Sequence, residues 1–123
     1  MSILTETNHA GGFLVWEVLR DYTRETVTIA SGAGKLEPGT VLGQITTGGK
    51  FTKLTPAATN GSQNAAGILW AGVDASAADS PGVVVLRGPA LVNRHEIIWP
   101  EGATEAQITA ATTALGALGI ILR

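Results

Sequence analysis

The order of apolar and polar positions predicts a chain made mainly of β-strands. Residues 26–29 alternate between threonine and an apolar residue, which is the two-residue period of a strand with one buried face. A Gly-Gly pair separates the runs 41–46 and 51–55, and this arrangement indicates a hairpin. The continuous apolar run 66–73 has the length of a buried central strand, and 83–86 predicts another strand.

Turn residues divide these strands. Pro38-Gly39 stands directly before the run 40–42, and a Pro-Gly pair fits the two central positions of a type II turn. Residues 56–64 and 75–82 are rich in small and polar residues and predict loops. Residues 90–99 predict one or two short strands that end at Pro100.

One helix is predicted near the C-terminal end of the sequence. Thr104 followed by Gln107 is a capping-box pattern. Gly119 ends the helix, and residues 120–122 predict a closing strand. The apolar stripe of the helix, at spacings i, i+3, i+4 and i+7, consists of Ile108, Ala111, Thr112 and Leu115.

The outer face of this helix is small and uncharged. No charged residue stands between Glu105 and Arg123, whereas a helix with one buried face usually carries charges on the other. We expect either a surface for self-association, or a helix that its own chain covers, or an exposed face that is merely rich in Ala and Thr. The candidate residues of such a self-association surface are Thr109, Ala110, Thr113, Ala114 and Ala117.

The beginning of the sequence predicts a flexible arm, residues 1–18, before a β-rich domain, residues 19–123. Residues 1–12 end in Ala-Gly-Gly and hold little that could anchor a core. Residues 13–22 fit both the apolar stripe of a helix and a strand. In so short an apolar run, the spacing of the apolar residues does not distinguish the two.

Composition excludes several classes of protein. A length of 123 residues predicts one domain, and the absence of cysteine excludes disulfides, Cys-ligated zinc and thiol catalysis. A net charge of −2 with scattered basic residues argues against direct binding of nucleic acid. The start of the sequence lacks a signal peptide, and no apolar run is long enough to span a membrane, so we expect a soluble protein made in a cytoplasm. Charged residues make up only 15% of the chain, against about 25% in typical domains, which suggests a surface partly hidden by partners.

No motif predicts an enzyme, a cofactor or a metal site. His9 lies in the predicted arm, and His95 and Glu96 are neighbours on a predicted strand, where their side chains would point to opposite faces. Gly32-Ala33-Gly34-Lys35 lacks both the first glycine and the hydroxyl residue of a phosphate-binding loop. Of the three tryptophans we expect Trp70 and Trp99 to be packed and Trp16 to face a partner.

An ordered set of segments resembles the head decoration proteins of tailed bacteriophages, the type known from phage lambda. The likeness covers roughly residues 13–123. No single segment is specific for the family, but the full set of segments in this order is. In the C-terminal half the segments are Ala65-Ala66-Gly67-Ile68-Leu69, Trp99-Pro100-Glu101, the Thr/Ala helix and Gly119-Ile120-Ile121-Leu122; upstream they are Phe13-Leu14 with Glu17, 24–28 and 38–43.

This resemblance implies a small β-clip-like barrel or sheet domain with one C-terminal helix, which assembles as a homotrimer on the outer surface of the expanded capsid. It further implies a virion protein that stabilises the head against packaged DNA, whose N-terminal arm adds as a strand to the major capsid protein. The arm residues would be Ile3, Leu4, Thr5, Thr7, Phe13, Leu14, Val15 and Trp16. The alternative is a small-molecule-binding or enzymatic β domain, because the turn at 36–42 also resembles that of SAF domains.

Overall fold

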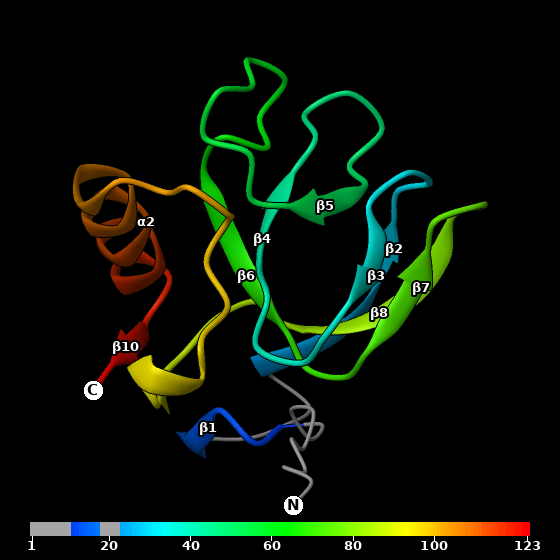
Figure 1. Ribbon diagram of the computed structural model, residues 1–123. Helices are drawn as coiled ribbons and strands as arrows, with labels where there is room; N and C mark the ends of the chain where they lie inside the picture. The colour runs from blue at the N-terminus through cyan, green and yellow to red at the C-terminus, as the bar shows by residue number, and fades with distance from the viewer. Residues whose placement is uncertain (1–10, 18–22) are drawn as a thin grey trace, which may run out of the picture.

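The computed structural model describes residues 11–17 and 23–123, which form a mainly β fold with one α-helix (Figure 1). The strands are β1 (Leu14–Glu17), β2 (Arg24–Ile29), β3 (Gly34–Leu36), β4 (Val41–Gln44), β5 (Phe51–Lys53), β6 (Ala65–Leu69), β7 (Val73–Ala75), β8 (Ser80–Val85), β9 (Ala90–Val92) and β10 (Ile120–Leu122). The helices are the 3-10 helix η1 (Arg94–Glu96) and the α-helix α2 (Glu105–Ala117).

Five strands close into a barrel in the order β2-β5-β4-β6-β8. Its longest pairing joins β2 and β8 in antiparallel register from Arg24↔Val85 to Ile29↔Ser80. The interior is filled by branched and aromatic side chains, which suit a pleated and buried surface. The most buried of them are Ile29, Leu42, Leu69 and Val84.

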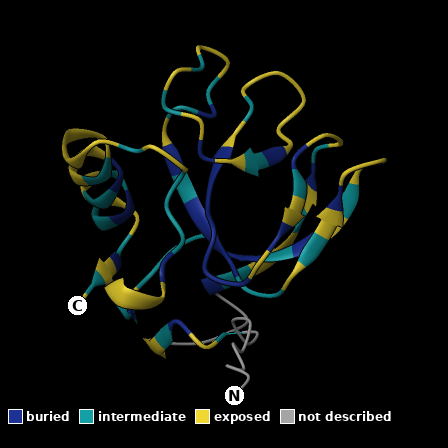
Figure 2. Ribbon diagram, in the orientation of Figure 1, coloured by how far each residue is buried: buried dark blue, intermediate teal, exposed yellow. Residues whose placement is uncertain are grey.

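A three-stranded sheet, β1-β9-β10, lies against the barrel together with α2. The central strand β9 pairs antiparallel with β1 and parallel with β10. The inner face of this sheet and the inner side of α2 share one core with the barrel. Figure 2 shows the buried stretches of the barrel strands and of α2 in dark blue. Figure 1 shows this sheet at the end of the molecule opposite the loop between β4 and β5.

Several expectations from the sequence are confirmed. Gly39 has a φ of 95°, and the turn closes where the backbone N–H of Thr40 donates to the carbonyl of Glu37 at 3.3 Å. The hairpin of β4 and β5, the strand β2 and the closing strand β10 are all present. Both hydrogen bonds of the capping box at Thr104 and Gln107 are formed, and Ala111 and Leu115 are the buried residues of α2.

Two strand predictions were wrong in part. The apolar run 66–73 is not one strand, because β6 ends at Leu69 and the chain turns before β7 leaves the barrel to pair with β3. His95 does not lie on a strand. The Asn93 side chain accepts a hydrogen bond from the backbone N–H of His95 at 3.0 Å and so caps the 3-10 helix that begins at Arg94.

Candidate assembly surfaces

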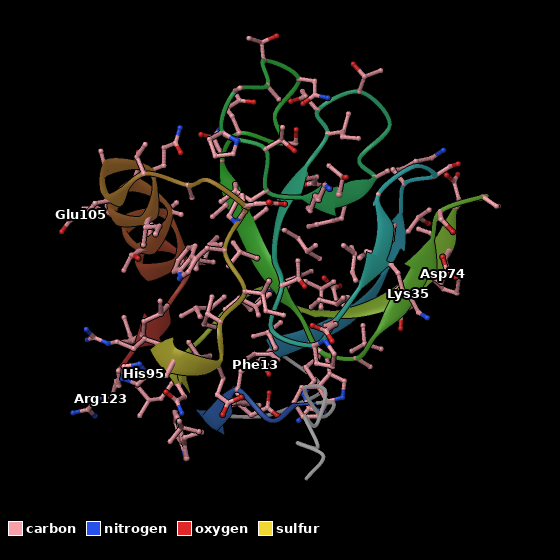
Figure 3. All side chains as sticks on the ribbon, in the orientation of Figure 1. Phe13, Lys35, Asp74, His95, Glu105 and Arg123 are labelled. Carbon is pink, nitrogen blue, oxygen red and sulfur yellow. The ribbon has the colours of Figure 1, made fainter. Side chains whose placement is uncertain are left out.

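Residues 11–17 are attached to the barrel by close packing around Trp70. Phe13, labelled in Figure 3, is 2% exposed, and its ring meets the Trp70 ring edge-on with the centroids 6.3 Å apart. The backbone N–H of Gly11 donates to the Trp70 carbonyl at 2.9 Å, and that of Asn93 donates to the Phe13 carbonyl at 2.7 Å. A side chain at Gly11 would overlap the Trp70 ring, since its Cβ would lie 1.9 Å from a ring carbon. This segment therefore belongs to the folded domain.

A polar network that includes Arg24, which lies over the Trp70 ring, supports the same attachment. The Glu17 carboxylate accepts hydrogen bonds from the Thr23 hydroxyl at 2.5 Å and from Arg24 Nε at 3.1 Å, and a second guanidinium nitrogen of Arg24 completes a bidentate pair. The Arg24 guanidinium carbon also lies 3.5 Å from the centre of the Trp70 ring. Trp70 is half-buried, packs against the core as the sequence predicted, and links β1 to the barrel.

The structure divides the predicted arm residues into three groups. Phe13 is buried and Leu14 packs against the same core, because β1 pairs with β9 of its own chain. Val15 and Trp16 are exposed. Ile3, Leu4, Thr5 and Thr7 lie outside the described residues, as does residue 18.

The outer face of the β1-β9-β10 sheet is apolar. Trp16 of β1 and Ile121 of β10 both pair with Leu91 of β9, so the three side chains form one row across the sheet. Val15 is 62% exposed, Trp16 50% and Ile121 47%, and Leu91 is half-buried. Sequence reasoning identified Trp16 but missed Leu91 and Ile121. The available signal was that 120–122 is apolar at every position, as in a strand covered on both faces.

The outer face of α2 is a second uncharged surface. Of its predicted interface residues, Thr109, Ala110, Thr113 and Ala117 are exposed, while Ala114 packs partly against the core. Leu118, at the C-cap of the helix, is 37% exposed. This face offers small side chains that would let another chain approach closely.

Two aspartates, Asp74 and Asp79, are held in local contacts. Asp79 accepts hydrogen bonds from Lys50 at 2.6 Å and from the backbone N–H of Ser31 at 2.7 Å, and these two contacts hold the pKa of Asp79 below its ordinary value. The hydroxyl and backbone N–H of Ser76 likewise lower the pKa of Asp74. Within residues 11–17 and 23–123, no group of three His, Asp or Glu side chains could hold a metal ion.

Two hollows bear on the alternative of a ligand site. The larger, about 750 Å³, lies near the end of α2. Its charged lining residues are Glu25 and Arg87, which form an ion pair at 2.7 Å, and Lys50, which pairs with Asp79 at 2.6 Å. The smaller, about 240 Å³, lies beside the turn at Pro38-Gly39 and is lined by Lys53, Trp99 and other residues. It falls below the roughly 300–1,000 Å³ of most small-molecule pockets. The hollow beside the turn that resembles that of SAF domains therefore does not favour the alternative of a ligand-binding domain.

Comparison with known families gives a match along almost the whole chain. The family model described as bacteriophage lambda head decoration protein D matches residues 3–120. A comparison with curated proteins finds no match. In the described part of the chain, no helix is long and apolar enough to cross a membrane.

Proposed function

Because the chain belongs to the bacteriophage lambda head decoration protein D family, we propose that it binds as a trimer to the expanded head of a tailed phage and stabilises that head against the pressure of packaged DNA. The family supports a role in capsid decoration, and hence a structural protein of the virion. The observation that carries the proposal is the match over residues 3–120, which includes the segment before β1 as well as the folded domain.

In this proposal the residues before Gly11 form the capsid-binding arm. Ile3, Leu4, Thr5 and Thr7 supply the apolar and β-forming side chains of a strand that adds to an exposed sheet edge of the major capsid protein. Phe13 and Leu14 are left out of the pairing segment, since removing them from the core would cost the domain its attachment to β1. The arm therefore ends where the packing around Trp70 begins.

A trimer makes such an arm effective. Each backbone hydrogen bond contributes only about 0.5–1.5 kcal/mol, whereas ordering one residue costs about 1–2 kcal/mol. A single short arm therefore binds weakly. Three arms on one trimer act at high effective concentration, which can raise the overall affinity by about 10²–10⁴.

The trimer interface is proposed to lie on the outer face of α2. Thr109, Ala110, Thr113 and Ala117 present no charge and little side-chain volume to an approaching copy. Ala114 stands between these residues and the core and would keep α2 in place. Sedimentation equilibrium of the free protein tests this assignment: Ala110→Glu should shift the chain from trimer towards monomer.

Binding to heads tests the function as a whole. Purified protein is mixed with expanded, undecorated heads of the phage that encodes it, and bound chain is measured by co-sedimentation. We expect saturation near three copies for each threefold position, and loss of binding when residues 1–10 are deleted. The double variant Ile3→Ser, Leu4→Ser keeps the length of the arm and should bind weakly as well. Failure of the full chain to bind expanded heads would refute the proposal.

A further inference from the structure

Large exposed hydrophobic side chains are concentrated on one sheet face. The structure exposes four of them among the described residues, and Val15, Trp16 and Ile121 all belong to the β1-β9-β10 sheet. Leu91, their partner in register, lies between them on the central strand. Single exposed hydrophobic residues are common on protein surfaces, but contiguous ones mark an interaction site.

A shift of register widens this apolar row. Between Leu14 and Trp16 the pairing of β1 with β9 moves by one residue, so that Val15 and Trp16 together oppose Leu91. Leu14 is left packed against the core while its two successors are exposed. An antiparallel pair that faces water on one side normally carries polar residues there. The outer face of this sheet does not follow that rule.

The arm leads directly to this face. Ten residues precede Gly11, which is hydrogen-bonded to Trp70 and stands three residues before β1. Ten residues span at most about 33–36 Å when fully extended. Wherever the arm pairs with the shell, the sheet that carries Trp16 is held within that distance of the pairing site.

We infer that the outer face of the β1-β9-β10 sheet, formed by Val15, Trp16, Leu91 and Ile121, is a second and rigid contact with the major capsid protein. The inference rests on the proposed function and adds to it a surface besides the arm. The occupant is the shell and not a second copy of the chain, because the arm brings this face to the shell and because α2 offers copies a separate uncharged face. Trp and other aromatic residues are enriched in the buried centre of such interfaces.

The first test compares charged substitutions on two surfaces. Ile121→Lys places a charge at the β10 end of the apolar row, and Thr47→Lys places one in the exposed β4–β5 loop, at the opposite end of the molecule (Figure 1). We expect Ile121→Lys to weaken binding to expanded heads by at least tenfold while the melting temperature and the oligomeric state stay unchanged. Thr47→Lys should bind like the parent chain.

Because the chain contains no cysteine, a second test can measure how well a single introduced thiol is protected while the protein stays bound to heads. Ile121→Cys and Thr47→Cys each introduce one thiol. Its rate of alkylation is measured by mass spectrometry, from the increase in the mass of the chain. In the free protein both thiols should react readily. On heads the thiol at position 121 should react at least tenfold more slowly, and that at position 47 at an unchanged rate.

The outcomes separate the inference from the proposed function. If the parent chain binds heads but Ile121→Lys binds within twofold of it and the thiol at position 121 stays reactive, the face does not touch the shell. If that thiol is already protected in the free protein, the face is covered without the shell and the inference is overturned. If the parent chain does not bind heads at all, the proposed function itself fails.

Discussion

Phe13→Ala should destabilise the fold as a core substitution does. Phe13 is 2% exposed and packs edge-on against Trp70, although it lies near the start of the chain where a flexible arm was expected. Replacing a buried Phe by Ala typically costs about 3–5 kcal/mol through lost burial and the cavity that remains. With an unfolding entropy of about 2.1 cal/mol/K per residue over 123 residues, that loss lowers the melting temperature by roughly 12–19 °C.

The measurement is urea and thermal unfolding followed by circular dichroism at one protein concentration, because self-association makes stability depend on concentration. Val15→Ala is the matched control: its side chain is 62% exposed, and substitutions at such surface sites usually change stability by less than about 0.5 kcal/mol. Hydrogen exchange adds a local measure, since the Asn93 amide bonds to the Phe13 carbonyl and should exchange faster in Phe13→Ala. If Phe13→Ala lowers the free energy of unfolding by less than about 1 kcal/mol, the packing argument is refuted, and residues 13–17 are better assigned to the flexible arm.

Three further predictions concern other parts of the fold. Gly88→Ala should cost at least about 1–3 kcal/mol in urea unfolding, because the added Cβ would lie 1.8 Å from the backbone oxygen of Gly119; unchanged stability would contradict this. Thr104→Ala should cost about 0.5–2 kcal/mol by removing the cap of α2, whereas Thr104→Ser should retain most of the stability. The folded-state pKa of Asp79 is lowered, so its contribution to stability is full above the ordinary value of 3.8 and is lost as pH falls through the lowered value. In Lys50→Met an NMR titration should find the Asp79 pKa raised towards that ordinary value, and an unchanged pKa would show that Lys50 is not the cause.

The sequence predicted those elements that local chemistry determines. The capping box at Thr104 and Gln107 and the turn at Pro38-Gly39 require only neighbouring residues, and both were found where expected. The mainly β class with one C-terminal helix followed from the strand and helix periods.

The sequence did not predict features that depend on distant residues. The packing of Phe13 needs Trp70, which stands 57 positions away, so the local pattern around Phe13 was compatible with a free arm. The run 66–73 is apolar throughout, so its hydrophobic pattern did not show that β7 pairs with β3 outside the barrel, although Gly72 stands directly before β7. At His95 a local signal did exist, because Asn93 is a residue type that commonly caps helical turns.

The low charge of the chain follows from how its surface is divided. The ion pairs Lys50–Asp79 and Arg87–Glu25 lie on the barrel, and residues 106–122, which form almost all of α2 and β10, contain no charge. Charge on the barrel keeps that surface compatible with water, whereas a charge buried in an interface carries a desolvation penalty. If partners cover the helix and the outer sheet face, the absence of charged side chains from these two surfaces avoids that penalty. The scarcity of charge that the composition shows is therefore local, and it coincides with the two faces proposed to meet other copies and the shell.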